Sequence, residues 1–184
     1  MVLKTPRLWL RELCATDIAA LNEIERDPRV TRYMTFDVQT TDQTRAYIEG
    51  AVRQQSDDPR RFFDLAIVLG GEHPDASGAL PRELIGRCGL GIRRPEHRES
   101  ELWYELHPAH WGRGYAFEAA SALLQFGFTS LELHRVWADC DPRNRASCRI
   151  AERLGMTLEG RLRENYFLKG EWCNSAVYGI LNRE

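Results

Sequence analysis

The chain has 184 residues and a formal net charge of −2, with 43% hydrophobic and 28% charged residues. This size and composition predict a soluble globular protein whose single domain spans residues 1–184. The near-neutral charge argues against nucleic-acid binding, no apolar run reaches the roughly 20 residues of a membrane span, and the N-terminus has no signal-peptide pattern, so we expect a cytoplasmic protein.

The N-terminal part predicts a strand followed by helices. Leucines alternate with polar residues over residues 8–13, which favours a half-buried strand. Thr16 or Asp17 is placed to cap a first helix. A second helix begins at Asp27 followed by Pro28, because an N-cap carboxylate and a proline at the first helical position both favour a helix start.

A third helix and two strands follow. Thr41 or Asp42 is predicted to cap this helix. Its inward-facing residues are expected to be Tyr47, Ile48, Ala51 and Val52. Apolar runs predict strands over residues 62–69 and 84–92. Between them, residues 70–81 are rich in Gly, Pro, Asp and Ser and are predicted to form a loop.

The second half of the chain continues to alternate strands and helices. The predicted elements are, in order, a turn over 93–100, a strand over 102–106, a helix over 114–129, a strand over 135–140, a helix over 144–154, and a hairpin with strands over 158–167 and 172–181. Because strands and helices interleave in mixed order, the pattern favours an α/β or α+β class with one central sheet.

A glycine-containing turn joins the strand over 102–106 to the helix over 114–129. Its residues are Trp111, Gly112, Arg113, Gly114, Tyr115 and Ala116. A helix N-terminus leaves backbone N–H groups without intrahelical partners, and glycine lets the backbone approach a phosphate closely. The turn therefore predicts a phosphate or pyrophosphate site. Its spacing excludes a G-x-x-x-x-G-K-[ST] loop, and Phe117 replaces the last glycine of a G-x-G-x-x-G dinucleotide motif.

Further motifs occur in a fixed order around this turn. They are T-P-R-L-W-L-R at residues 5–11, H-P-A-H-W-G-R-G-Y-A at 107–116, L-H-R-V at 133–136, N-R-A-S at 144–147, L-G-M at 154–156, E-G at 159–160 and G-E-W at 170–172. This set resembles the GNAT superfamily of acyl-CoA N-acyltransferases, and within it the ribosomal-protein N-terminal acetyltransferases of the RimJ/RimL type. The resemblance implies a mixed, mostly antiparallel sheet of about seven strands, splayed between the fourth and fifth strands and flanked by helices.

The same resemblance implies acetyl-CoA as co-substrate and no metal. Its pyrophosphate is expected against the backbone of residues 112–116, with Trp111 at a position where the family more often has Gln or Arg. The backbone of Leu106 and His107 is expected to pair with the pantetheine amides. The five cysteines are odd in number and include no C-x-x-C pair, so they too predict neither a metal site nor a disulfide framework.

Two residues of the helix over 144–154 are also expected to bind the co-substrate. By resemblance, the Asn144 amide lies on the pantetheine arm and the Ser147 hydroxyl lies near the thioester sulfur. They share one face at a helix start because they are three residues apart. Without the resemblance, Asn144 is more simply an N-cap and Ser147 a solvent-facing residue.

The resemblance implies direct attack of an amine on the thioester, which requires a proton acceptor and a proton donor. Glu101 is the first candidate base, because this branch often has a glutamate at this point of the strand. Ser147 is the first candidate acid and Tyr166 the second. The chain departs from the branch twice, since Asn165 and Tyr166 stand where a catalytic carboxylate is expected and Asn174 stands where an aspartate is usual.

These residues leave more than one function open. The leading prediction is an acetyl-CoA-dependent N-acetyltransferase whose acceptor is a protein N-terminal amine. The alternatives are a transferase for a small amine, such as an antibiotic, amino acid or polyamine, and a non-catalytic acyl-CoA sensor. Residues 28–41 and 70–81 are expected to line the acceptor side. The expected partners exclude nucleic acid and membranes, and the expected state is a monomer or homodimer.

Overall fold

The computed structural model describes residues 1–70 and 83–184, so nearly all of the loop predicted over 70–81 lies outside the described residues. The helices are α1 (Ile18–Glu25), α2 (Pro28–Thr31), α3 (Thr41–Gln54), α4 (Tyr115–Thr129) and α5 (Arg145–Arg153). The strands are β1 (Val2–Lys4), β2 (Leu8–Glu12), β3 (Phe62–Leu69), β4 (Leu84–Arg94), β5 (Glu99–Leu106), β6 (Arg135–Cys140), β7 (Thr157–Leu168) and β8 (Glu171–Leu181).

The strands of the described residues form one sheet of eight strands in the order β1-β2-β3-β4-β5-β6-β8-β7. Neighbouring strands are antiparallel except β5 and β6, which are parallel. Their register joins Glu99–Glu101 to Arg135–Trp137 and ends there, so the two strands diverge beyond Glu101. The predicted mixed, splayed sheet is confirmed. The predicted seven strands become eight because β1 pairs with β2.

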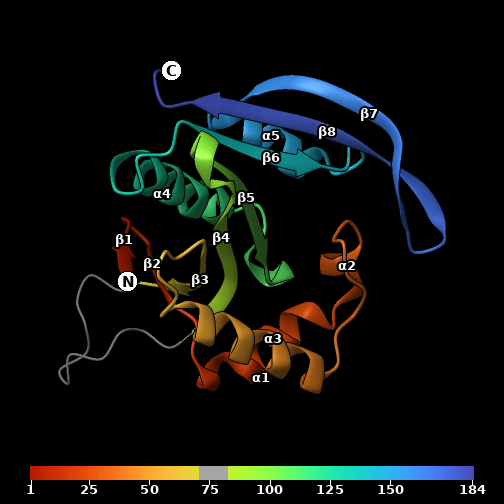
Figure 1. Cartoon of the computed structure of the whole chain (residues 1–184). Coiled ribbons are helices and arrows are strands. Elements are labelled where there is room, and N and C mark those ends of the chain that lie inside the picture. The colour runs from red at the N-terminus through yellow and green to blue at the C-terminus, as the bar shows by residue number, and fades with distance from the viewer. Residues whose placement is uncertain (71–82) are drawn as a thin grey trace.

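Helices cover both faces of this sheet (Figure 1). On one face, Ala120 and Leu123 of α4 pack into the main core with Leu90 of β4. On the other face, Ile24 of α1 packs against Val68 of β3. These layers bury the apolar face of each helix, which supplies most of the helical stability in a folded protein.

Several boundaries differ from the predicted ones. The predicted turn over 93–100 is short, because Glu99 pairs with Arg94 across β4 and β5. Ion pairs to Arg94 and Arg135 compensate the charge of Glu99, which makes a strand here acceptable. The cap of α3 is Thr40, one residue before the predicted choices, and its side chain accepts a hydrogen bond from the N–H of Gln43. Sequence patterns rarely fix a helix end to one residue.

The inward face predicted for α3 is also partly wrong. Ile48 is fully buried, but Tyr47 and Val52 are each 39% exposed. The reason is that α3 packs mainly on α1, where Ile48 meets Ile18 and Leu21. Tyr47 is only partly covered, although its hydroxyl reaches the buried Asp64 of β3.

A buried ionic cluster lies beneath α1 and α3. Arg87 of β4 donates to Glu105 of β5 at 2.6 Å and to Asp64 of β3 at 3.0 Å, and it lies 3.3 Å from Glu25 of α1. Tyr47 donates its hydroxyl hydrogen to Asp64. Three carboxylates thus face one guanidinium. Burial raises the pKa of Glu105 to about 7, and the neighbouring carboxylates add to this shift while Arg87 opposes it.

Candidate active site

The turn before α4 has the geometry of an anion site. Gly112 and Gly114 have φ values of 73° and 80°, a region that favours glycine. Gly114 is the N-cap of α4 and supplies no side-chain cap. The backbone N–H groups of the first helical turn are therefore available to a ligand, and the helix dipole favours negative charge there. This donor set fits the pyrophosphate that the sequence predicts at residues 112–116.

The N-terminal segment holds this turn in place. Glu118 in the first turn of α4 accepts hydrogen bonds from the Thr5 hydroxyl at 2.6 Å and from the Arg7 amide N–H at 2.8 Å. The guanidinium of Arg7 also pairs with Glu118, donates to the carbonyl of Arg113 at 2.9 Å and lies 4.6 Å from the ring centroid of Tyr115. Sequence reasoning gave Arg7 no role, because its partners lie more than 100 residues away.

Trp111 fixes the end of β5. Its indole Nε1 donates to the carbonyl of Leu106 at 2.8 Å. The N–H of His107 donates to the carbonyl of Ile85 at 2.8 Å, and the carbonyl of His107 accepts from His110 at 2.9 Å. Backbone direction alternates along a strand, so the N–H of Leu106 points to the opposite edge, toward β6. A pantetheine contact at His107 stays a prediction, and its N–H is already engaged.

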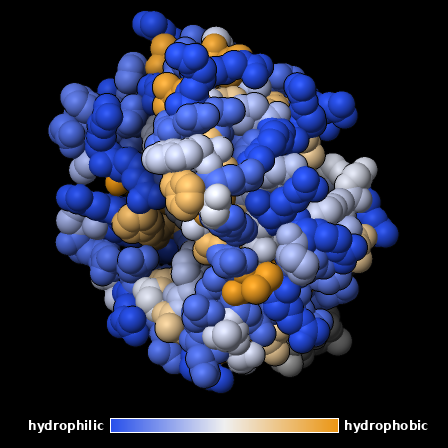
Figure 2. All heavy atoms as spheres, turned by 90° about the vertical axis from the view of Figure 1, so that its right-hand side faces the viewer, coloured by the Kyte–Doolittle hydropathy of each residue, from blue (hydrophilic) through white to orange (hydrophobic). Residues whose placement is uncertain are grey.

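A cavity of about 100 Å³ lies where β5 and β6 diverge, and we call it the cleft. It is lined by Tyr33, Met34, Glu101, Leu102, Trp103, Tyr104, Ala138, Asp139, Cys140, Asp141, Asn144, Ser147, Ala151, Leu154 and Met156. The predicted residues Glu101, Asn144 and Ser147 are therefore brought together, whereas Tyr166 is not among the lining residues. The face that carries α2 and the β7–β8 hairpin is mostly hydrophilic, with scattered hydrophobic patches (Figure 2).

The three predicted catalytic residues have different surroundings. Glu101 is half-buried, and its Oε2 accepts a hydrogen bond from Nε of Arg93 at 2.8 Å. Ser147 donates its backbone N–H to Oδ1 of Asn144 at 3.3 Å, so Asn144 is an N-cap of α5. Tyr166 lies on β7, where burial and the negative charge of Asp141 raise its pKa to about 12.

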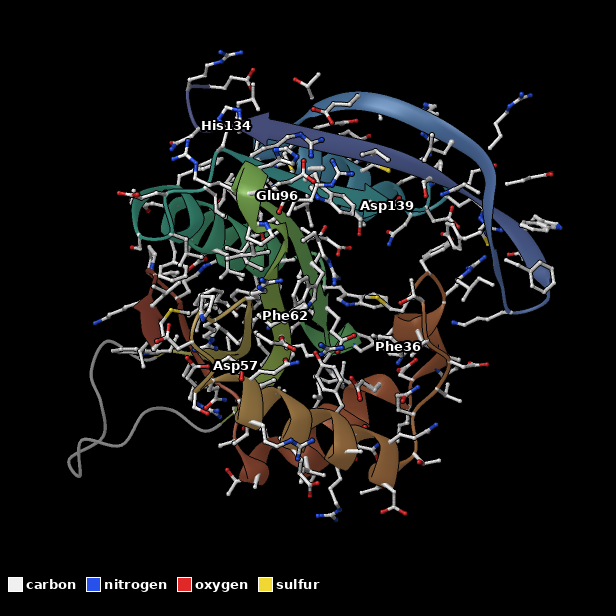
Figure 3. All side chains as sticks on the ribbon, viewed as in Figure 1. Phe36, Asp57, Phe62, Glu96, His134 and Asp139 are labelled. Carbon is white, nitrogen blue, oxygen red and sulfur yellow. The ribbon has the colours of Figure 1, made fainter. Side chains whose placement is uncertain are left out.

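Sequence reasoning missed two carboxylates of the cleft, Asp139 and Asp141, of which Asp141 is paired with Arg143. Asp139 lies on β6 near the point where β6 leaves β5 (Figure 3). Its Oδ2 accepts a hydrogen bond from the Ser175 hydroxyl at 2.7 Å. Partial burial raises its pKa, the Ser175 hydrogen bond opposes that shift, and the charge of Glu101 adds to it. The alternation along β6 carried a signal, because Asp139 points away from the buried Ala138 and Cys140.

The second departure from the branch has a structural explanation. Oδ1 of Asn174 accepts a hydrogen bond from the N–H of Glu164 at 2.7 Å. Glu164 has a φ of 47°, and the register of β7 and β8 shifts between Leu162 and Tyr166. Asn174 therefore holds a β-bulge in β7, a type of irregularity that redirects neighbouring side chains.

The β7–β8 hairpin reaches over to α2 (Figure 1), where the Lys169 ammonium donates to the carbonyl of Thr31. Trp103 lies across β4, where a Cβ added at Gly89 would approach its ring to 2.3 Å. The cleft thus has an aromatic wall on the side of α1 and α3.

Among residues 1–70 and 83–184, no group of three His, Cys, Asp or Glu side chains could hold a metal ion, and no helix is long and apolar enough to cross a membrane.

Comparisons with known proteins agree with this geometry. The family profile of the acetyltransferase (GNAT) domain matches residues 7–157. The uncharacterized N-acetyltransferase p20 of Bacillus licheniformis is 32% identical over 182 residues, covering 99% of this chain and 97% of p20. A GNAT-family acetyltransferase from Bacillus anthracis has a TM-score of 0.83 at 28% identity, with 100% of both chains covered. RimL, a ribosomal L7/L12 alpha-N-protein acetyltransferase in complex with coenzyme A, shares the fold with a TM-score of 0.82 at 18% identity over 98% of each chain. The chain therefore belongs to the GNAT acetyltransferase family and is an acetyl-CoA-dependent N-acetyltransferase.

Proposed function

We propose that this enzyme binds acetyl-CoA and a primary amine together and that the amine attacks the thioester directly. The observation that carries this proposal is the cleft between β5 and β6, which Glu101, Asp139 and Ser147 line together. Proton acceptors and a hydroxyl donor then surround one reacting centre. Cys140 also lines the cleft, but burial raises its pKa to about 12, so it is a neutral thiol at physiological pH and a poor nucleophile.

The co-substrate would be held by the residues that the resemblance implies. The free N–H groups of residues 112–116 suit the pyrophosphate, and the Trp111 indole keeps the end of β5 beside them. Leu106, His107 and Asn144 are the proposed contacts of the pantetheine arm. When bound, acetyl-CoA supplies an activated acyl thioester. A backbone N–H of β5 that faces the cleft can polarise its carbonyl.

Asp139 is the proton acceptor that the geometry favours. Its Oδ2 is held by Ser175, and within the described residues its Oδ1 has no hydrogen-bond partner, so Oδ1 is free to take a proton from the amine. Glu101 is the second candidate, because its carboxylate is paired with the cation of Arg93, whereas the partner of Asp139 is a neutral hydroxyl. Both carboxylates face the same cleft, and an ionised carboxylate there also attracts the ammonium form of the acceptor.

Ser147 is the proton donor that we favour, because its hydroxyl lines the cleft. Tyr166 is the second candidate. It ranks second because it lies outside the residues that line the cleft. A positioned acid contributes by protonating the thiolate as it leaves, so the donor must reach the sulfur.

For the acceptor, we propose the α-amine of a polypeptide, as in the RimJ/RimL branch. An α-amine has a pKa near 8, against about 10.4 for lysine, so a larger share is neutral at physiological pH. The aromatic and sulfur side chains of Tyr33, Met34 and Trp103 offer apolar contacts beside the carboxylates. A small-molecule amine is the second candidate, supported by the modest volume of the cleft, about 100 Å³.

Thiol release from acetyl-CoA in the presence of an amine panel tests the proposal. The panel contains peptides with free and blocked N-termini, polyamines and amino acids. We expect peptides with a free N-terminus to be acetylated, and Asp139→Asn to lower kcat by roughly 10²–10⁴. Asp57→Asn is the matched control, because Asp57 lies far from Asp139 in the fold (Figure 3).

Each outcome decides one part of the proposal. CoA binding without thiol release across the panel would identify an acyl-CoA sensor. Turnover of small amines but of no peptide would show that the acceptor is a small-molecule amine rather than a polypeptide α-amine. If the kcat of Asp139→Asn stays within threefold of the value for the unchanged enzyme while Glu101→Gln loses activity, Glu101 is the base. Ser147→Ala and Tyr166→Phe compare the two donors in the same way.

A further inference from the structure

A chain of hydrogen bonds crosses three strands and ends at the carboxylate of Asp139. Nδ2 of Asn165 on β7 donates to Oγ of Ser175 on β8 at 3.0 Å. Oγ of Ser175 then donates to Oδ2 of Asp139 on β6 at 2.7 Å. Ser175 is fully buried, so the middle of this chain is closed to water. A buried chain of this kind is expected to have one fixed direction.

The direction follows from the donor inventory. The Asn165 amide offers Ser175 a hydrogen and takes a lone pair of the hydroxyl oxygen. A serine hydroxyl has one hydrogen, and that hydrogen is left for Asp139. Donation to an ionised carboxylate is stronger than donation between neutral groups, so the ionised form of Asp139 is stabilised. The chain therefore points from β7 toward the cleft.

The β-bulge of β7 brings Asn165 to Ser175. Leu162 pairs with Ser175 and Tyr166 pairs with Cys173, so three residues of β7 lie opposite Asn174. The bond from the Glu164 N–H to Asn174 holds this arrangement. If the register of Leu162 and Ser175 continued without the bulge, Asn165 would lie opposite Trp172 rather than beside Ser175. The bulge thus has a consequence at the cleft.

We propose that Asn165 and Ser175 are positioning residues that fix the Asp139 carboxylate through Oδ2 and leave Oδ1 to accept the proton of the acceptor amine. This inference rests on the proposed function of Asp139. It assigns a role to the asparagine that replaces the carboxylate of the RimJ/RimL branch. Neither residue touches the reacting atoms, so their effect is on the orientation and ionisation of Asp139.

The charges around Asp139 explain why it needs such support. Glu101 of β5 and Asp141 beyond β6 are negative and raise the pKa of Asp139, as does partial burial. The charge of Asp139 contributes to the raised pKa of Tyr166 on β7, and Arg143 pairs with Asp141. The Ser175 hydrogen bond opposes the upward shift. Its removal is expected to raise the pKa of Asp139 further.

The test uses the full-length chain and two readouts, the kcat/KM of the acceptor against pH and the ¹³C titration of the Asp139 carboxyl group. Ser175→Ala is expected to raise the pKa of Asp139 by about one unit, which moves the acidic limb of the kcat/KM profile to higher pH. It is also expected to lower kcat/KM on the plateau roughly tenfold, because the carboxylate loses its fixed orientation. The dissociation constant of CoA stays unchanged. Ser175→Thr keeps the hydroxyl and is expected to retain the titration of the unchanged enzyme.

Asn165→Ala is the second variant, at an exposed position where folding is preserved, and Asn182→Ala is its matched control beyond the end of β8. We expect a smaller rise of the Asp139 pKa in the first and none in the second. Asn165→Asp is expected to lower activity, because its carboxylate competes for the single Ser175 hydrogen. Higher activity in Asn165→Asp, or an unshifted Asp139 titration in Ser175→Ala, would overturn the proposed positioning role of Asn165 and Ser175. If Asp139→Asn loses activity but the titration in Ser175→Ala is unshifted, Asp139 remains the proposed base and only the positioning role of Ser175 and Asn165 is refuted.

Discussion

The anion site at α4 depends on the left-handed conformation of Gly114, which makes Gly114→Ala an informative change. Gly114 has a φ of 80°, and an added Cβ would lie 3.5 Å from Nη2 of Arg7, an ordinary contact. Steric overlap therefore adds little, and the cost is the backbone strain of an L-residue in this region, about 1–2 kcal/mol. The turn relieves this strain by changing φ, which turns the N–H donors away from a common point.

If that strain is expressed in ligand binding, the dissociation constant of CoA rises roughly five- to thirtyfold. Isothermal titration calorimetry with CoA measures this without knowledge of the acceptor. Gly170→Ala is the matched control, because Gly170 has a φ of 84° and no atom within 4 Å of an added Cβ. It lies in the β7–β8 turn, so it is expected to lose similar thermal stability while its affinity for CoA stays constant.

Two results would refute this reasoning. A CoA affinity within twofold of the unchanged protein in Gly114→Ala would show that the N–H groups at α4 do not hold the ligand. An equal loss of affinity in Gly170→Ala would show that the effect comes from lower stability rather than from the turn.

Three further predictions concern the clamp that Arg7 forms on Glu118 and the carbonyl of Arg113, and the buried cluster around Arg87. Arg7→Ala removes the contacts to Glu118 and to the carbonyl of Arg113, so the dissociation constant of CoA is expected to rise roughly three- to tenfold in calorimetry, and an unchanged value would contradict the clamp. Arg87→Met leaves buried carboxylates without their cation and is expected to lower the free energy of unfolding by about 3–5 kcal/mol in urea, whereas a loss below about 1 kcal/mol would contradict the role of Arg87. The pKa of Glu105 is raised to about 7 in the folded state, so its stabilising contribution is complete below about pH 4.5 and is lost as the pH rises through 7. Between pH 5 and 8, the unfolding free energy of the unchanged protein is expected to fall by up to about 3 kcal/mol because of Glu105, and Glu105→Gln is expected to remove this part of the fall. An unchanged pH dependence in Glu105→Gln would contradict the raised pKa of Glu105.

Most of the fold could be predicted from local patterns. The strands β3 and β6 have the predicted bounds, because an apolar run between polar turns is readable along the chain. β1 was not predicted, since three residues carry no periodicity and their strand forms by pairing with β2. The early start of β5 likewise depends on its pairing with β4 and β6. Pairing between distant segments is a tertiary effect that overrides local propensity.

The cleft was partly predictable for the same reason. Glu101, Asn144 and Ser147 were predicted from the family resemblance, and the structure brings them together in the cleft. Asp139 could not be predicted from local sequence, because the hydrogen bond that marks it joins it to Ser175, 36 residues away. A carboxylate on a half-exposed strand reads as a solvated residue until the neighbouring strand is known.

The two asparagines of the hairpin, Asn165 and Asn174, both affect the charge around Asp139. A carboxylate at position 165 would lie one hydroxyl away from Asp139, and both would need the single hydrogen of Ser175. Two carboxylates that share one donor raise each other's pKa, so one of them would be protonated in the range where a base must be ionised. An amide at 165 removes that competition and adds a donor. An aspartate at 174 could accept the Glu164 N–H as Asn174 does, but it would add another negative charge to the same face. Asparagines at both positions are therefore consistent with the proposed role of Asp139 as an ionised base. Residue 165 and residue 139 should be regarded as one unit when the base of a related enzyme is assigned.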